Sequence, residues 1–507
     1  MDTARPSLAI VPAGADGASA AAGLAETHTA LVVFVGERAF KLKKPVSLGF
    51  LDFSTREARK EACEREVALN RRLAPDVYLG VVDVVDADGR PCEHLVVMRR
   101  LPERARLSSL AAAGAPLEGE MRRLARLLAA FHTRAERSEA IDEASGPEAM
   151  LARFEANAAR LGELPGELHH PAASQRVLEL ARAYLVGRGP LLAGRVAAGR
   201  ACDGHGDLLA DDIFCLDDGP RILDCLEFDD TLRFGDALGD VAFLAMDLER
   251  LGRDDLAGSL LEEYGRFSGD SWPASLAHLH LAHRAQVRAL VAAVRAVQGV
   301  TASAETARSL LALALAHLEA GRVRLVVVGG LPGTGKSTLA AGLADALGAC
   351  LLRSDELRKQ SRGLDVATPG GAALDEGLYD PSVTAATYAT LLERARICLS
   401  HGESVVLDAT FTDPRWRAEA RALAGDASAV LGELRCTAPA DVAASRLSDR
   451  AGRGDASDAT AAVAATMADR DQPWPTAATV DTSGPPAETR RTALALLVGA
   501  ASLRSRP

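Results

Sequence analysis

The C-terminal part of the chain contains the stretch Arg324-Leu-Val-Val-Val-Gly-Gly-Leu-Pro-Gly-Thr-Gly-Lys-Ser-Thr338. Residues 324–329 are an apolar run typical of a buried strand, and a helical pattern begins after the glycines. Glycines allow backbone N–H groups to converge on a phosphate at the start of a helix. The stretch therefore predicts a nucleotide phosphate loop, made of Gly330, Leu331, Pro332, Gly333, Thr334, Gly335, Lys336, Ser337 and Thr338.

Two side chains of this loop have predicted chemical roles. Lys336 supplies a positive charge to the β- and γ-phosphates of ATP, and Ser337 offers its hydroxyl to Mg²⁺. Around the loop, residues 323–485 alternate strand and helix patterns, which predicts a parallel sheet covered by helices. We expect an α/β P-loop kinase fold over residues 321–490, followed by a C-terminal helix or tail over 491–507.

The next strand, predicted over residues 349–353, ends at Ser354-Asp355-Glu-Leu-Arg358. The carboxyl ends of strands hold the ligands of open α/β sheets, so this turn should face the nucleotide. The Asp355 carboxylate can then accept the proton of an attacking hydroxyl, and Arg358 can hold an anionic or polar acceptor. The alternative is that Asp355 only caps the following helix.

Further along, one carboxylate and a group of arginines complete the predicted site. Asp408 ends a strand predicted over residues 404–408, where it can hold a magnesium-bound water or simply terminate the strand. Arg446, Arg450 and Arg453 follow on a helix and loop at spacings of four and three. They form either a lid that neutralises the transferred phosphoryl group, with Arg446 and Arg450 binding ATP, or a solvated helix face.

Together these motifs resemble the small-molecule and polynucleotide P-loop kinases, over residues 323–485. The resemblance implies that Asp355 is the base toward the acceptor hydroxyl. Such sequences are often grouped with the AAA ATPases, although no arginine-finger pattern of a ring motor follows the loop.

A second set of catalytic-type residues lies in the N-terminal part. The chain reads Cys202-Asp-Gly-His205-Gly-Asp207-Leu-Leu-Ala-Asp-Asp212, and Asp224 follows in a predicted β-run. A kinase needs one carboxylate to orient the acceptor hydroxyl and oxygen ligands for Mg²⁺, one of them after the next strand. Asp207, Asp212 and Asp224 supply such a set in that order.

Upstream residues supply a nucleotide-binding half. The β-type runs 30–35, 38–43, 80–85 and 94–98 accompany one helix pattern over 55–73. Lys41, in Arg38-Ala-Phe-Lys41, can reach the α- and β-phosphates, and Lys43 shares its strand face as the competing candidate. Glu66 is the expected ion-pair partner, with Glu64 as the alternative. Met98 is expected beside the adenine.

These residues resemble the aminoglycoside phosphotransferase family, which has a protein-kinase-like α+β fold. The match covers about residues 28–320 and is closest to a branch fused to a P-loop domain. It implies Asp207 as catalytic base, with Asp212 and Asp224 as magnesium ligands. Two positions depart from the family's H-G-D-L-H-x-x-N loop, because Leu209 replaces its second histidine and Asp212 its asparagine. Only Gly36 marks the phosphate-binding turn.

Bulk properties set the remaining limits. A chain of 507 residues is too long for one core, and we expect two domains, at 27–320 and 321–490, after a flexible arm over 1–26. The net charge of -11 argues against an extended nucleic-acid-binding surface. Eight cysteines without a paired or metal-type spacing, and no long apolar run, indicate a cytoplasmic protein without a membrane span.

Two functions of different kinds compete. The first is a bifunctional tandem kinase that uses ATP and Mg²⁺ to phosphorylate hydroxyl groups of small molecules, with a polynucleotide acceptor left open. The second is a regulatory ATP-binding protein whose N-terminal domain senses a ligand without catalysis. Acceptor-side residues such as Asp207 and Asp355 favour the first, since a pure switch does not need them. Neither the acceptors nor the oligomeric state follow from the sequence.

Overall fold

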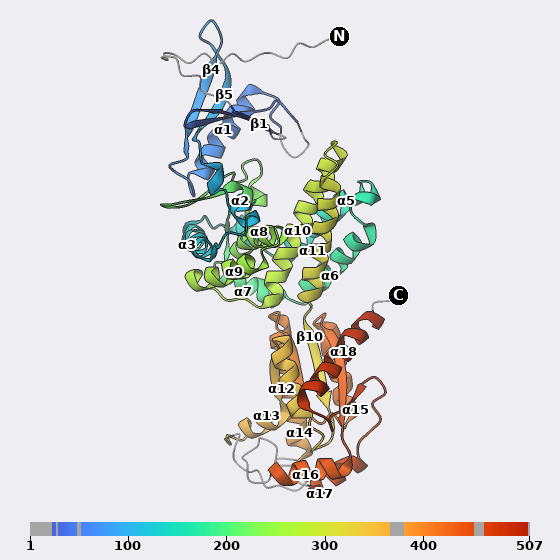
Figure 1. Ribbon diagram of the computed structural model, residues 1–507. Helices are drawn as coiled ribbons and strands as arrows, with labels where there is room; N and C mark the ends of the chain where they lie inside the picture. The colour runs from blue at the N-terminus through green and yellow to red at the C-terminus, as the bar shows by residue number, and fades with distance from the viewer. Residues whose placement is uncertain (1–22, 27–28, 48–51, 366–379, 451–460, 505–507) are drawn as a thin grey trace. The chain divides into compact units, whose positions relative to one another are not determined.

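The computed structural model describes residues 23–26, 29–47, 52–365, 380–450 and 461–504 (Figure 1). The chain folds into two compact units, each assembled from separated segments. The first unit comprises Met1–Ala135, Asp203–Phe234 and Asp247–Ser268, and the second comprises Glu136–Cys202, Gly235–Met246 and Gly269–Pro507. The unit limits do not follow the predicted boundary near Gly321, and the division into domains at that point stays a prediction.

The first unit contains a five-stranded antiparallel sheet in the order β1-β2-β3-β5-β4. Its strands are β1 (Gly23–Glu26), β2 (Ala30–Val35), β3 (Arg38–Lys43), β4 (Tyr78–Val85) and β5 (Pro91–Arg99). The predicted limits of β2 and β3 are confirmed. The predicted flexible arm over 1–26 is wrong for its last four residues, because their backbone pairs with β2; residues 1–22 lie outside the described part.

One helix packs on this sheet and joins its core. Helix α1 (Arg56–Asn70) begins after Thr55, whose hydroxyl accepts a hydrogen bond from the Ala58 N–H at 3.1 Å. Cys63 and Val67 of α1 pack against Ala39, Val96 and other apolar residues of the sheet. The helix thereby presents Glu66, which is fully buried, to the same face of the sheet.

The remainder of the first unit holds the loop with the predicted catalytic residues. Strands β7 (Ile213–Leu216) and β8 (Gly219–Ile222) form an antiparallel hairpin directly after the segment that contains Asp207 and Asp212. Helices α2 (Leu107–Ala112), α3 (Glu118–Arg134) and α9 (Asp254–Ser268) complete the unit. His132 of α3 is hydrogen-bonded to Tyr264 of α9 at 2.9 Å in the buried contact between these two helices.

In the second unit, helices and a parallel sheet follow one another along the chain. The helices before the sheet are α4 (Glu139–Ala144), α5 (Pro147–Gly162), α6 (Pro171–Val186), α7 (Gly189–Ala197), α8 (Ala237–Arg250), α10 (Ala274–Val297) and α11 (Ser303–Ala320). Helix α8 belongs to this unit only up to Met246. The short strands β6 (Ala201–Asp203) and β9 (Phe234–Asp236) lie at segment limits. Helix α11 buries Ala307, Leu310, Leu311, Ala314 and Leu318, which recur at the period of an α-helix.

All strands of the C-terminal sheet are parallel, in the order β11-β12-β10-β13-β14. They are β10 (Arg324–Gly329), β11 (Cys350–Arg353), β12 (Val405–Asp408), β13 (Val430–Thr437) and β14 (Ala478–Asp481). The helices are α12 (Lys336–Leu347), α13 (Ser354–Gln360), α14 (Pro381–Ser400), α15 (Pro414–Asp426), α16 (Ala440–Arg450), α17 (Ala461–Asp469) and α18 (Pro486–Arg504). The predicted parallel α/β fold is confirmed.

The last helix belongs to this fold. Helix α18 begins before the predicted limit at 490, and Ala493 and Leu497 are buried with Val326, Val328 and other residues of the sheet and of α12. The prediction was a helix or tail over 491–507. The described residues form a helix, but it begins at Pro486, and its apolar side chains complete the core of the sheet. None of the described helices combines length and apolar character sufficient to cross a bilayer.

Candidate active sites

Lys41 lies at the centre of a buried ion-pair network in the first unit. Its ammonium is 2.8 Å from Glu66 Oε1 and 2.6 Å from Asp224 Oδ1. Burial opposes the charge, but the Asp224 and Glu66 carboxylates raise the pKa of Lys41 well above its ordinary value. Lys41 therefore stays protonated, and it joins the strand β3, the helix α1 and the segment after β8. Glu64, the alternative partner, is exposed and lies 3.9 Å from Lys60.

Lys43 uses the other oxygen of the same glutamate. Its ammonium is 2.6 Å from Glu66 Oε2 and also forms an ion pair with Glu227. The Lys43 side chain is 1% exposed, whereas that of Lys41 is 12% exposed. Both lysines share a strand face, as predicted, but only Lys41 contacts Asp224 among the pairs that the described residues form. Lys41 is thus the better placed of the two to meet a ligand.

Glu227 is a site residue that the sequence interpretation missed. It lies three residues after Asp224 and holds Lys43 in place. Burial raises the pKa of Glu227, although Lys43 acts in the opposite direction. The sequence did contain a signal for it. Two lysines, Lys41 and Lys43, had one expected carboxylate partner, and Glu227 follows the predicted metal ligand Asp224 by three residues.

The predicted catalytic loop is held by His205. This side chain is fully buried; its Nε2 is 3.1 Å from the Leu223 carbonyl oxygen, and its Nδ1 lies 3.4 Å from the Asp207 backbone N–H. Between them Gly206 has φ 88°, and a Cβ there would lie 3.0 Å from the Arg233 side chain. A glycine is therefore required for this turn. The turn places Asp207, partly buried, beside the segment that carries Asp224.

Asp224 differs from its prediction, because it follows β8 and lies outside any strand. Its φ of 61° is left-handed, a conformation that costs free energy for a non-glycine residue. The Asp224 N–H donates to the Tyr78 hydroxyl at 3.2 Å, and the Cys225 N–H donates to Asn70 Oδ1 at 2.9 Å. Residues of β4 and α1 thus hold the turn that directs Asp224 toward Lys41.

The three predicted carboxylates influence one another. Burial, and then the charges of Asp224 and Asp207, raise the pKa of Asp212 well above its ordinary value. In the described residues, no group of three His, Cys, Asp or Glu side chains is already arranged around a metal position. Crowded carboxylates of this kind are nevertheless hard oxygen donors whose mutual repulsion a divalent cation would relieve. The donor set fits Mg²⁺.

Met98 and Gly36 lie near this network in the sheet. Met98 of β5 is 8% exposed, pairs in register with Ala39 of β3 and belongs to the sheet core. Gly36 has φ 54° in the turn between β2 and β3. Met98 thus lies on a strand of the sheet and Gly36 in the turn between two strands, in agreement with their predicted places beside the nucleotide. That either residue contacts a nucleotide stays a prediction.

In the second unit, glycines shape the predicted phosphate loop between β10 and α12. Gly330, Gly333 and Gly335 have φ values of 143°, 83° and 78°. A Cβ at Gly333 would lie 2.6 Å from the Ala443 carbonyl oxygen, and one at Gly330 would lie 2.7 Å from that of Cys436. Helix α12 begins without a side-chain cap. Its first N–H groups are therefore available to an anion.

Two loop residues stabilise this shape from inside. The Thr334 hydroxyl donates to the Leu331 carbonyl oxygen at 2.7 Å, and the Gly330 N–H donates to the Thr410 carbonyl oxygen at 3.1 Å. Thr334 and Pro332 are buried, Leu331 and Ser337 are half-buried, and Thr338 is exposed. Hydrogen bonds within the protein thus hold the loop in its observed shape.

Lys336 has the position that its predicted role requires. It is 7% exposed at the first residue of α12, and it forms no ion pair within the described parts of the chain. The pKa of the nearby Cys436 thiol is raised by burial to about 12, with Lys336 lowering it and Asp408 raising it. Lys336 and Asp408 therefore both lie close to Cys436. A buried ammonium without a carboxylate partner is costly, and a bound phosphate would compensate its charge.

Asp408 can accept a further ligand. It is 4% exposed at the end of β12, its Oδ2 lies 3.2 Å from Arg353 Nε, and its Oδ1 has no hydrogen-bond partner among the described residues. A buried carboxylate oxygen without a donor needs an explanation. Together with the Ser337 hydroxyl, this oxygen fits Mg²⁺ or a water bound to it.

Asp355 and Arg358 lie together on α13, which begins where β11 ends. Arg358 Nη1 is 2.8 Å from Asp355 Oδ1. Arg353 occupies the N-cap position, and no side chain caps the helix there, so the capping alternative for Asp355 has no support. Both groups also affect the pKa of Tyr388, which burial raises. They therefore lie near this tyrosine, at the carboxyl edge of the sheet.

An aromatic wall beside Asp355 was not predicted. The Tyr388 ring stacks on Trp416 at 4.8 Å between ring centroids, and its hydroxyl accepts a hydrogen bond from the Phe411 N–H at 3.0 Å. Trp474 lies against Gly329, where a Cβ would be 2.4 Å from its ring. These residues come from different elements, so no local pattern could have grouped them.

The predicted lid is described in part. Arg446 of α16 donates to the Thr482 carbonyl oxygen at 2.7 Å, and its Nη1 would lie 3.3 Å from a Cβ at Gly335. Arg446 therefore lies next to the phosphate loop. The side chain of Arg450 and all of Arg453 lie outside the described residues.

Comparison with known proteins agrees with this arrangement. Residues 49–279 match the phosphotransferase enzyme family, and residues 325–473 match a family described as AAA domain. The uncharacterized protein Rv2004c of Mycobacterium tuberculosis is 46% identical over 460 residues, which cover 91% of this chain and 92% of that protein. The chain belongs to the same family as this protein. This chain thus joins a domain of the phosphotransferase enzyme family to one of the family described as AAA domain.

Solved structures of low sequence identity each match part of the chain. A sugar kinase from Janibacter sp. is 22% identical, with a TM-score of 0.29, over 35% of this chain and 95% of its own. A choline/ethanolamine kinase family protein from Mesorhizobium loti is 15% identical, with a TM-score of 0.36, over 59% and 92%.

Proposed function

We propose that this protein is an ATP-dependent tandem kinase, in which each site transfers the γ-phosphate of ATP to a hydroxyl group of a small molecule. The observation that carries the proposal is the position of Lys336. It is a buried cation without a partner in the described residues, next to a glycine loop and an uncapped helix N-terminus. Asp355 and Arg358 accompany it at the same sheet edge, where an acceptor would lie.

In the P-loop site, we assign the proton transfer to Asp355. As the acceptor oxygen bonds to the γ-phosphorus, the bond to the β-phosphate oxygen breaks, and the hydroxyl proton passes to Asp355. Arg358 positions the acceptor, while Lys336 and Arg446 offset the charge of the phosphates. Mg²⁺, when bound, would add positive charge to the phosphate oxygens, and Ser337 and Asp408 would hold it.

In the kinase-like site, Asp207 has the corresponding role. It accepts the hydroxyl proton while ATP yields ADP and the phosphorylated acceptor. Lys41 contacts the α- and β-phosphates and is oriented by Glu66. Asp212 and Asp224 would hold Mg²⁺, which requires that Asp224 exchange its contact with Lys41 for the cation.

The acceptors we infer are small hydroxyl compounds, with a short polynucleotide as a further candidate at the P-loop site. Extended nucleic-acid binding is disfavoured by the net charge of -11. The eight cysteines, all within the described residues, form no disulfide, which is typical of a reducing compartment, and we infer the cytoplasm.

The test is an ATP-consumption screen over sugars, amino sugars, nucleosides and short polynucleotides. It compares the wild type with Asp207→Ala and Lys336→Ala. We expect each substitution to abolish a different acceptor-dependent activity. If Asp207→Ala leaves the activity unchanged with every acceptor, the N-terminal domain is no enzyme and the regulatory alternative replaces it.

A further inference from the structure

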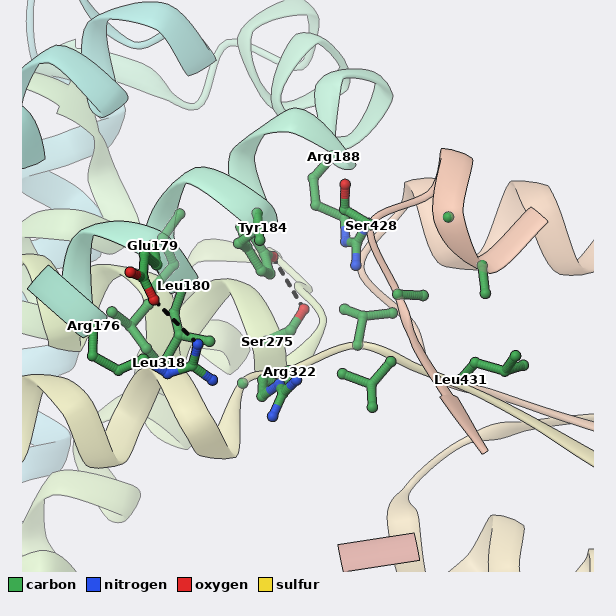
Figure 2. A pocket seen from close by; sticks show the side chains of 18 of the residues that line it. Arg176, Glu179, Leu180, Tyr184, Arg188, Ser275, Leu318, Arg322, Ser428 and Leu431 are labelled. Carbon is green, nitrogen blue, oxygen red and sulfur yellow. Dashed lines mark hydrogen bonds and ion pairs between the residues drawn. The ribbon is translucent and has the colours of Figure 1, made fainter. Parts of the chain in front are cut away.

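The second unit contains a cavity that neither predicted active site uses. Its volume is about 610 Å³, within the usual range of small-molecule sites. Its walls come from α6, α10 and α11, from α15, and from the first residues of β13. All lining residues belong to this one unit. Figure 2 shows the side chains of most of them. The cavity contains no residue of the phosphate loop or of the Asp355 turn.

Arg188 is the unusual residue of this cavity. It is 1% exposed, and its guanidinium donates to the Ala427 carbonyl oxygen and lies 5.4 Å from the Tyr184 ring. Its Nε has no hydrogen-bond partner, and no carboxylate pairs with it, in the described part of the chain. Burial lowers the pKa of Arg188 to about 10, so the group remains charged at neutral pH.

The other lining arginines already have acidic partners. Arg176 lies 3.0 Å from Glu319, Arg322 lies 3.1 Å from the same carboxylate, and Arg421 lies 2.9 Å from Glu433. Arg188 is therefore the cation of this cavity that lacks compensation. A buried guanidinium left unpaired is costly, which makes the position favourable for an anion.

The surroundings of Arg188 indicate the rest of the ligand. Leu180, Leu279, Leu318 and Val430 contribute apolar walls. The Tyr184 and Ser275 hydroxyls are 3.0 Å apart (Figure 2). Ser275 also donates to the Gly402 carbonyl oxygen at 2.7 Å. These hydroxyls satisfy each other, and the lining carboxylate Glu179 lies 3.4 Å from Arg176. The Arg188 guanidinium is therefore the charged group of the lining that stays uncompensated. A ligand with one charged head and an apolar body matches this distribution.

We propose that this cavity is a binding site for a small organic anion, whose carboxylate or phosphate head contacts Arg188 and whose apolar body packs on the leucine and valine side chains. The site is separate from both nucleotide sites and adds a ligand that the tandem-kinase reaction does not require. The head forms charge-assisted hydrogen bonds with the guanidinium, and a planar carboxylate or a phosphate suits its geometry.

The experiment uses the full chain with Lys336→Ala, so that anion binding at the phosphate loop does not contribute. Octanoate and octyl phosphate are compared with octanol and octylammonium, by calorimetric titration and by the shift in Tm. We expect both anions to bind and to raise Tm, the neutral analogue to bind at least about tenfold more weakly, and the cation not to bind. The two anions show which head is preferred.

Variants assign the binding to this cavity. Arg188→Met keeps the volume and should weaken octyl phosphate binding at least about tenfold, whereas Arg322→Gln, which removes an arginine that already has a partner, should change it by less than about threefold. Ala183→Trp, at an exposed lining position of α6, adds bulk and should weaken binding if Arg188→Met fails to fold. Equal affinity for octyl phosphate and octanol, or unchanged affinity in Arg188→Met or in Ala183→Trp, overturns the proposal.

Discussion

Two neighbouring lysines of β3 share one buried glutamate, and this separates their functions. Glu66 gives one carboxylate oxygen to each, at 2.8 Å and 2.6 Å. Lys43 is enclosed by Glu66 and Glu227, while Lys41 extends to Asp224. We infer that Lys41 meets the nucleotide and that Lys43 positions Glu66.

Substitution of each lysine by methionine tests this division. Lys41→Met should reduce kcat/KM of the N-terminal activity by a factor of about 100 or more, because a phosphate contact is lost. Lys43→Met should instead lower the free energy of unfolding by about 3 kcal/mol, because Glu227 loses its buried partner. Urea unfolding and initial rates distinguish the two. An equal loss of stability in both variants would contradict the assignment.

Asp212 makes the stability of the first unit dependent on pH. Its pKa is raised above the ordinary value of 3.8, so the folded state holds its proton more tightly than the unfolded state. The protonated Asp212 carboxyl therefore contributes its full stabilisation at pH values below 3.8, the ordinary pKa. This contribution is lost as the pH rises through the higher pKa of Asp212 in the folded state.

Asp212→Asn should thus stabilise the metal-free protein at pH 7, with a rise in Tm of about 2–4 °C for ~1 kcal/mol. The difference from the wild type should disappear near pH 4, and the variant should lose its response to added Mg²⁺. Thermal scans from pH 4 to pH 8 provide the measurement. If the variant is less stable than the wild type at pH 7, the charge of Asp212 is already balanced by cationic groups of the protein, and the prediction is wrong.

At the level of elements, the phosphate loop depends on close approach between backbones. Gly333 has a positive φ and faces the Ala443 carbonyl oxygen of α16 at a distance that no Cβ tolerates. Gly348, at the end of α12, also has a positive φ of 57°, but nothing lies within 4 Å of its missing Cβ. A substitution at Gly348 therefore tests backbone strain alone, whereas one at Gly333 tests strain together with a steric clash.

Gly333→Ala should therefore weaken ATP binding at the P-loop site at least tenfold, because α16 and the loop must move apart. Gly348→Ala should cost only about 1 kcal/mol of stability, with ATP affinity unchanged. Equilibrium binding of a fluorescent ATP analogue and chemical unfolding report the two effects. If both variants bind ATP like the wild type, the loop does not hold the phosphates.

For the whole molecule, the two predicted nucleotide sites belong to different compact units, with Lys41 and Asp207 in the first and Lys336 in the second. Residues that share no partner usually have additive effects. The double variant Asp207→Ala, Lys336→Ala should lose both activities, and its change in unfolding free energy should equal the sum of the single changes within about 0.5 kcal/mol. A larger deviation, measured by denaturant titration, would indicate coupling between the sites.

Much of the local structure could be predicted because it depends on short-range pattern. The limits of β2, β3 and β10 follow from runs of apolar residues and their period. The glycine loop after β10 likewise carries its own conformational requirement, since its glycines have positive φ values. Each of these features concerns residues that are neighbours in the chain.

Other features depend on packing between distant segments. Lys43 and Glu227 are 184 positions apart, and the turn of Asp224 is held by Tyr78 and Asn70, so neither could be read from a local motif. The packing of α18 in the core of the sheet and the unpaired charge of Arg188 also depend on segments that are distant in the sequence. Local sequence sets backbone preference and the chemistry that a residue offers. Which charge is compensated, and which is left for a ligand, is decided when the chain packs, because compensation requires a partner within about 4 Å.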